Sequence, residues 1–187
     1  MKVGKIRRIL DHKFFKAKYP ITPQYDQVDC GPAALLSILK YYGGDASLVY
    51  LRELCQVDVE GTTMLELVNA AKSLGFDANG ATGEYEDLMK EDMPCIAHVI
   101  LETGLNHFIV IWEIDSKGVL VGDPGRGKYK LSKEEFIDIW KQKAVILLKP
   151  KDNLYTSTSS SWFSWIIAYV KKELSQSCII PDSEKPL

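Results

Sequence analysis

The hydrophobic period of the sequence changes at Pro94, and this change constrains the fold most strongly. Before Pro94, apolar residues recur at helical spacing, which predicts helices over residues 31–42, 47–55 and 63–74 and a short turn of helix at 84–90. After Pro94, segments rich in Val and Ile alternate with turn signals, which predicts strands at 95–101, 106–114, 119–122 and 144–149. Between the last two strands, Ser132 and Glu135 form a capping box that opens one more helix. Helices followed by mostly antiparallel strands are typical of an α+β domain.

Helix start and stop signals support this reading. Gly31-Pro32 suits the start of the first helix, and Gly43-Gly44 ends it. Thr63 and Glu66 form a capping box for the third helix, and Gly75 is suited to the left-handed conformation that follows a helix. The helical half is therefore well bounded by sequence.

The length of 187 residues fits one domain with short extensions. We expect a basic lead-in at residues 1–23, a domain at 24–150, and a partly disordered segment at 151–187. That last segment holds a polar linker and the apolar run Trp162–Val170, which is shorter than the roughly 20 residues that cross a bilayer.

Charge and cysteine content exclude several classes. The 23 basic and 25 acidic residues give a net charge of −2, which argues against a protein that binds nucleic acid. The basic start has no long apolar stretch, so no secretory signal is predicted. Four cysteines without a Cys-x-x-Cys pair favour reduced thiols over disulfides or a zinc site.

Cys30 stands at the predicted start of the first helix. The positive end of a helix dipole stabilises a thiolate, which is the nucleophilic form of cysteine. We expect the thiol to be exposed there. The alternative, a buried structural cysteine, carries equal weight on the local sequence.

A cysteine nucleophile needs a base, and the chain has three histidines. His12 lies in the basic lead-in, and His98 lies inside a predicted strand, where Cys95 three residues away would face the opposite side. His107 begins a predicted strand after a turn, so we expect it at a strand end near a sheet edge, a better place for a base. A satisfied core imidazole remains the alternative for His98 and His107.

Asp123 ends the strand that follows His107 across a hairpin, so the two residues are expected to lie close together. A carboxylate there would orient the imidazole and hold its tautomer. The alternative is a turn-forming Asp before Pro124.

The residues together resemble the C39 peptidases, papain-like cysteine peptidase domains of ABC transporters that process and export bacteriocins and other peptides. The resemblance covers residues 24–150 and rests on Gln24-x5-Cys30-Gly31, Tyr41-Tyr42-Gly43, Ala70-Ala71-Lys72-x-Leu74-Gly75-Phe76, His107-Phe108-x-Val110 and Asp123-Pro124-x-x-Gly127. It implies that Cys30 is the nucleophile, His107 the base and Asp123 its orienting partner. It also implies that Gln24, six positions before the nucleophile, stabilises the oxyanion, and that Gln27 does not.

The resemblance further implies an endopeptidase that removes a leader peptide after a double-glycine type motif, Gly-Gly or Gly-Ala, without a cofactor. The expected partners are the precursor peptide and the transporter's membrane and nucleotide-binding domains, at the cytoplasmic side of a bacterial cell membrane. In that comparison, Trp162–Leu174 is similar to the region before a first transmembrane helix, and the chain is an isolated peptidase domain.

Two glycines offer no side chains to bind, so we expect selection by a narrow slot and affinity from an amphipathic leader helix docked in a groove. Two other functions remain open. One is a non-catalytic domain that docks cargo, although such domains lack the cysteine that Cys30 supplies. The other is a papain-like acyltransferase that passes the acyl group to an amine.

Overall fold

The computed structural model describes residues 18–157. The chain divides into two units, residues 1–156 and 157–187, and the fold described here belongs to the first. His12, Cys178 and the run Trp162–Val170 lie outside the described residues, so the expectations for them stay predictions. Residues on either side of 24–150 also contact the main core, namely Tyr19, Ile21, Leu154 and Tyr155.

The three predicted helices of the first half are present as α2 (Cys30–Tyr41), α3 (Leu48–Leu54) and α4 (Met64–Ser73). The Ser47 side chain caps α3, and Thr63 and Glu66 form the predicted reciprocal cap of α4. Gly75 has φ +94°, the left-handed conformation that glycine adopts at little cost after a helix. A 3-10 turn that the sequence did not predict, η1 (Gln27–Asp29), leads into α2.

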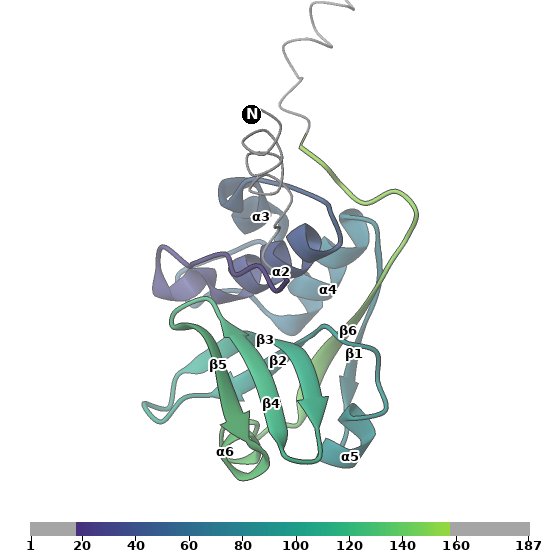
Figure 1. Cartoon of the computed structure of the whole chain (residues 1–187). Helices are drawn as coiled ribbons and strands as arrows, with labels where there is room; N and C mark the ends of the chain where they lie inside the picture. The colour runs from purple at the N-terminus through teal and green to yellow at the C-terminus, as the bar shows by residue number, and fades with distance from the viewer. Residues whose placement is uncertain (1–17, 158–187) are drawn as a thin grey trace, which may run out of the picture. The chain divides into compact units, whose positions relative to one another are not determined.

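Strands between residues 76 and 150 form one six-stranded sheet in which every neighbouring pair is antiparallel. Its order is β1-β6-β2-β3-β4-β5, so β6, the last strand of the described residues, lies between β1 and β2. The strands are β1 (Phe76–Thr82), β2 (Cys95–Ile100), β3 (Asn106–Asp115), β4 (Gly118–Asp123), β5 (Gly127–Ser132) and β6 (Ala144–Pro150), with short helices α5 (Tyr85–Leu88) and α6 (Lys133–Ile139). Figure 1 shows α2, α3 and α4 gathered on one side of this sheet. The α+β class, with helices packed on an antiparallel sheet, is confirmed.

Strand β1 was missed by sequence reasoning. Its residues, Phe-Asp-Ala-Asn-Gly-Ala-Thr, include Asp, Asn and Gly, which are depleted in strands. It forms because β6 supplies a seven-residue antiparallel partner, from Phe76 opposite Pro150 to Thr82 opposite Ala144. Tertiary pairing thus overrides a weak local preference.

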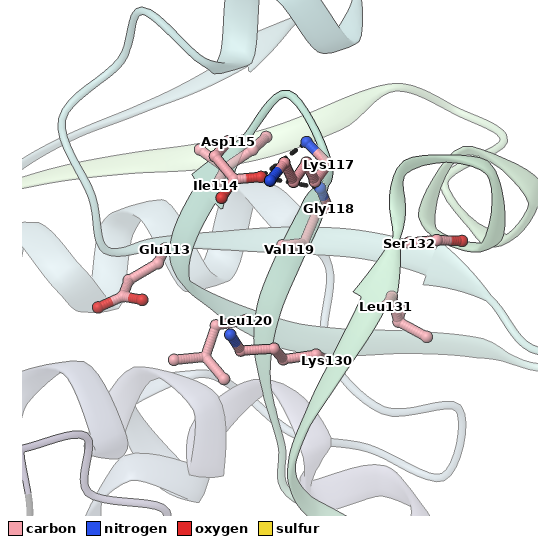
Figure 2. Close-up of a pocket in the computed structure, with 10 residues that line it drawn as sticks. All are labelled: Glu113, Ile114, Asp115, Lys117, Gly118, Val119, Leu120, Lys130, Leu131 and Ser132. Carbon is pink, nitrogen blue, oxygen red and sulfur yellow. Dashed lines mark hydrogen bonds between the residues drawn. The ribbon is translucent and has the colours of Figure 1, made fainter.

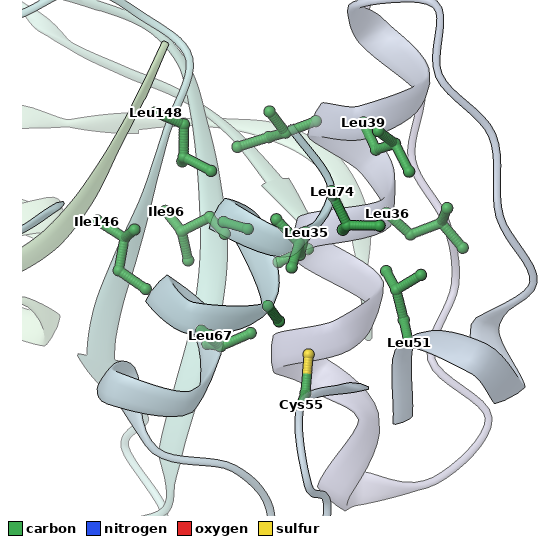
Figure 3. Close-up of a cluster of buried hydrophobic side chains, with 14 of the residues drawn as sticks. Leu35, Leu36, Leu39, Leu51, Cys55, Leu67, Leu74, Ile96, Ile146 and Leu148 are labelled. Carbon is green, nitrogen blue, oxygen red and sulfur yellow. The ribbon is translucent and has the colours of Figure 1, made fainter. Parts of the chain in front are cut away.

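The sheet has a buried cluster on each face. Alternate residues of β3 divide between them: Phe108 and Val110 join the cluster under the helices, and Ile109 and Ile111 join the other. Figure 3 shows the first cluster, where α2 and α4 bring Leu35 and Leu67 to the strands. Because α2 is fixed on the sheet in this way, its first residue is held near the ends of β3 and β4.

No helix among residues 18–157 has the length and apolar character needed to cross a membrane.

Candidate active site

Cys30 is the first residue of α2. Directly before it, the Asp26 side chain accepts a hydrogen bond from Gln27 N, and the Asp29 side chain accepts one from Asp26 N. These bonds fix η1, the turn that leads into α2. The expectation of an exposed thiol was wrong, because Cys30 is only 7% exposed and lies at the border of the main core.

An ion pair between a buried carboxylate and a partly exposed guanidinium anchors the same turn. The Arg52 guanidinium of α3 lies 2.7 Å from Oδ1 of Asp29, whose carboxylate is completely buried. Asp29 precedes Cys30 directly, so this pair ties the start of α2 to α3. Sequence reasoning missed it, since nothing in the spacing of residues 29 and 52 links a turn to a later helix.

His107 and Asp123 are brought together as predicted. Nε2 of His107 lies 2.8 Å from Oδ1 of Asp123, and both side chains are buried. His107 is the second residue of β3, and Asp123 ends the neighbouring strand β4. The expected strand end is correct, but the expected sheet edge is wrong, because β3 lies between β2 and β4 inside the sheet.

Two further groups hold the Asp123 carboxylate. Gly125 N donates to Oδ1 at 2.7 Å, and the Tyr129 hydroxyl donates to Oδ2 at 3.1 Å. Burial raises the pKa of Asp123, but the hydrogen bonds from His107 and Gly125 lower it, and the bond from Tyr129 has a smaller effect in the same direction. The net result is a pKa below the ordinary value of aspartate. Burial and the charge of Asp123 raise the pKa of Tyr129 to about 12, so its hydroxyl keeps the proton that it donates.

The Cys30 thiol contacts the His107 imidazole, so three candidate residues form one chain of contacts. Burial lowers the pKa of His107, but hydrogen bonds with Asp123 and Cys30 and their charges raise it to about 9. The imidazole therefore carries its proton at neutral pH. A protonated imidazole beside a cysteine stabilises the thiolate form.

Gln24 stands against the loop that carries Asp123. Its backbone N donates to Pro124 O at 3.0 Å, and its side-chain Oε1 is buried without a hydrogen-bond partner among the described residues. A Cβ placed on Gly125 would lie 3.6 Å from that side chain, so the loop leaves just enough room for it. Gln27, the other candidate, is exposed.

A cavity of about 350 Å³ opens beside Cys30. Its wall includes η1, the loop from Glu60 to Thr63 and the ends of β2 and β3. A larger cavity of about 560 Å³ lies at the hairpin between β3 and β4 and along β5 (Figure 2), where Asp115 accepts hydrogen bonds from the N–H groups of Lys117 and Gly118. Of the four candidate residues, Cys30 lines the smaller cavity and none lines the larger one, so the smaller cavity is the candidate reaction cleft.

The other thiols of the described chain serve the core. Cys55 and Cys95 have no exposed surface, and burial raises the pKa of each thiol, that of Cys55 to about 12. Among residues 18–157, no group of three His, Cys, Asp or Glu side chains is placed to hold a metal ion.

Comparison with known proteins agrees with this geometry. The sequence model of the peptidase C39 family matches residues 18–153. The pediocin PA-1 transport/processing ATP-binding protein PedD of Pediococcus acidilactici is 37% identical over 140 residues, which make up 73% of this chain. The aligned part covers only 18% of PedD, so this chain spans a small part of the length of that relative.

Two solved structures share the fold. The peptidase domain of Streptococcus ComA, described as a bi-functional ABC transporter involved in a quorum sensing pathway, is 37% identical with a TM-score of 0.66, over 71% of this chain and 99% of that domain. A double glycine motif protease from an AMS/PCAT transporter, solved in complex with the leader peptide, is 32% identical with a TM-score of 0.67, over 72% and 94% of the two chains. From the match over residues 18–153 and from these relatives, the chain belongs to the peptidase C39 family.

Proposed function

We propose that this chain is a cysteine endopeptidase that removes the leader from a precursor peptide by cutting after a double-glycine type motif, Gly-Gly or Gly-Ala. The observation that carries the proposal is the chain of contacts from the Cys30 thiol through His107 to Asp123, at the start of a helix and beside an open cleft. A similar protease was solved with a leader peptide, and a relative is named for pediocin processing and transport, which supports this substrate class.

The reaction begins with attack of the Cys30 thiolate on the carbonyl carbon of the scissile peptide bond. Negative charge collects on the carbonyl oxygen, where the backbone N–H of Cys30 and the Gln24 side chain act as hydrogen-bond donors. The N–H of Cys30 suits this task because the first N–H groups of a helix have no acceptor within the helix.

Protonated His107 then gives its proton to the departing amine as the C–N bond breaks, which leaves an acyl group on the sulfur. A water molecule attacks this thioester, and neutral His107 takes its proton. The carboxylic acid leaves and the thiolate returns. Asp123 keeps the imidazole oriented through both steps, as its 2.8 Å contact with Nε2 allows.

The setting of the reaction is also proposed. Relatives of this chain are much longer transport proteins with ATP-binding names, so we infer that it acts beside the membrane and nucleotide-binding domains of a peptide exporter, on the cytoplasmic side of a bacterial membrane. The cargo leader is an amphipathic helix that supplies affinity which the glycines cannot.

The test is incubation with precursor peptides that carry double-glycine leaders, followed by mass measurement of the products. We expect one cut directly after the motif, and none with Cys30→Ala, while Cys55→Ala, a matched change at another buried thiol, keeps the activity. Cleavage by Cys30→Ala, or cutting elsewhere, would overturn the proposal.

The same incubation separates the two other functions. A docking domain would bind the leader without cutting it, and an acyltransferase would join the leader's acyl group to an added amine in preference to water.

A further inference from the structure

Residues 19–24 form a strap, a segment without helix or strand structure that lies before η1. At its start, the Tyr19 hydroxyl bonds Glu113 of β3, and the Tyr19 ring packs on Trp112 with centroids 5.4 Å apart. At its end, Gln24 N donates to Pro124 O at 3.0 Å, in the loop after β4. The last residue of the strap is thus the proposed oxyanion donor, and both ends of the strap are held on the sheet.

The middle of the strap is held on α2, the helix that begins at Cys30. Thr22 N donates a hydrogen bond to Oγ of Ser37 at 2.8 Å, and the Ser37 hydroxyl donates to Ala33 O at 2.8 Å. Thr22 is 8% exposed and Ser37 only 1%. Without the serine hydroxyl, a buried backbone N–H would lose this acceptor, a situation that folded proteins nearly always avoid.

The helix relates this bond to the nucleophile. Ser37 lies seven positions after Cys30, which is about two turns and roughly 10 Å along the same face of α2. Because hydrogen bonds within α2 keep these two residues at a constant spacing, a strap that is bonded to Ser37 has a defined position relative to Cys30.

The connection from Thr22 to Gln24 is short and stiff. Pro23 alone separates them, and its ring fixes φ near −65° and restricts Thr22 to extended conformations. Two residues span at most about 7 Å, so a displacement of Thr22 is passed on to Gln24. Pro23 is exposed, so its ring is not part of the core.

The strap also packs closely on β4, the strand that ends at Asp123. A Cβ on Gly122, the residue before Asp123, would collide with the Ile21 side chain. The strap therefore lies against both the helix that carries Cys30 and the strand that carries Asp123, and Ser37 supplies its polar contact with the helix.

We propose that Ser37 is a positioning residue for the oxyanion site: by holding Thr22 N on α2, it sets the position of the Gln24 side chain relative to the N–H of Cys30. The inference rests on the proposed function, since it concerns the donor that Gln24 supplies there. Ser37 takes no part in proton transfer or in substrate binding, and it acts on the reaction only through Gln24.

Three substitutions test this arrangement. Ser37→Ala removes the hydroxyl and leaves Thr22 N without that acceptor. Pro23→Gly keeps the bond between Thr22 and Ser37 but loosens the connection to Gln24. Ser73→Ala is the matched control, because the Ser73 hydroxyl also donates to the carbonyl four residues earlier in its helix, at 3.1 Å, but belongs to α4 and is exposed.

Each substitution is made in the wild type and in Gln24→Ala. The main readouts are kcat and KM on a precursor peptide with a double-glycine leader. The rate at which iodoacetamide alkylates Cys30 shows whether the start of α2 is intact, and the melting temperature shows the effect on stability.

We expect Ser37→Ala to lower kcat by a factor of about 10–10², because a displacement of about 1 Å at a reacting group can cost this much. Pro23→Gly should lower kcat at least about threefold for the same reason. KM and the alkylation rate should stay within about twofold of wild type, since the oxyanion forms only in the transition state. Ser73→Ala should leave all three quantities unchanged.

The background without Gln24 separates positioning from a merely structural role. In Gln24→Ala, adding Ser37→Ala or Pro23→Gly should change kcat by less than about twofold, because no donor is left to position. The fall in melting temperature caused by Ser37→Ala should be the same in both backgrounds. A structural role would lower kcat equally in both.

Wild-type kcat in a folded Ser37→Ala, or an equal loss of kcat with and without Gln24, would overturn the inference. If Ser37→Ala melts below the assay temperature, Pro23→Gly decides, and wild-type kcat in that variant would overturn the inference. A Gln24→Ala protein with wild-type kcat would refute the oxyanion role of Gln24 and this inference with it. A wild-type protein that cuts no precursor would refute the proposed function itself.

Discussion

Replacing Asp123 with Asn separates the charge of this side chain from its hydrogen bonds. Oδ1 accepts from His107 Nε2 at 2.8 Å and from Gly125 N at 2.7 Å, so an amide oxygen in this place keeps both bonds. The amide nitrogen would then face the Tyr129 hydroxyl, which can turn from donor to acceptor. The geometry therefore predicts that all three bonds survive and that only the negative charge is lost.

The lost charge changes the pKa of His107. Burial lowers this pKa, and the hydrogen bonds and charges of Asp123 and Cys30 raise it to about 9. In Asp123→Asn the pKa should fall toward its ordinary value of 6.5. Since the leaving amine takes its proton from His107, activity should fall with rising pH at least one unit earlier than in the wild type, where the imidazole is protonated up to about pH 9.

The assay is kcat/KM on a precursor peptide between pH 5 and 10. Near pH 6.5 we expect Asp123→Asn to stay within about tenfold of wild type, whereas His107→Ala should lose a factor of about 10²–10⁴. Tyr129→Phe is the control, because it keeps the charge of Asp123 and both bonds to Oδ1. An unshifted alkaline limb would refute the account of the His107 pKa, and a folded Asp123→Asn that is inactive at every pH would show that the charge itself is indispensable.

Three other predictions concern the turn before α2 and its thiol. Gln24→Ala should lower kcat by a factor of about 10²–10³, the cost of one oxyanion donor, while Gln27→Ala should change kcat little. If steady-state kinetics show the larger loss of kcat in Gln27→Ala, the wrong glutamine was chosen. Arg52→Leu leaves the buried Asp29 carboxylate unpaired, so it should lower the free energy of unfolding, measured in urea, by about 3–5 kcal/mol. Adding Asp29→Asn should recover much of this loss. A free energy of unfolding within about 0.5 kcal/mol of wild type in Arg52→Leu would contradict the role of the pair. Iodoacetamide at pH 7, followed by peptide mapping, should label Cys30 before Cys55 and Cys95, because the raised pKa values of those two thiols keep them protonated. Earlier labelling of Cys55 or Cys95 would count against Cys30 as the nucleophile.

Local signals were enough to predict the helical half and the family. The capping residues Thr63 and Glu66, and the glycine at position 75, act within one turn of chain, so their effect is readable from sequence and the structure confirms it. The closeness of His107 and Asp123 was also predictable, because a hairpin joins their strands.

The parts that escaped prediction depend on partners distant in sequence or on loop geometry. Strand β1 exists through its pairing with β6, more than sixty positions later in the chain. The bond from Tyr129 to Asp123 requires that β5 pairs with β4, and the ion pair of Asp29 with Arg52 requires that α3 lies beside the start of α2. The roles of Gln24, Cys30, His107 and Asp123 stay predictions that kinetics must test.

The place of β6 between β1 and β2 sets the order in which the chain can finish folding during synthesis. Until Ala144–Pro150 leaves the ribosome, β1 has no neighbour and the cluster under the helices lacks Ile146 and Leu148. Cys30, His107 and Asp123 all emerge earlier, so the proposed nucleophile is made before the sheet that supports it is complete. A nascent chain that stops before residue 144 would leave both β1 and β2 with open edges, which are sites for pairing with other chains.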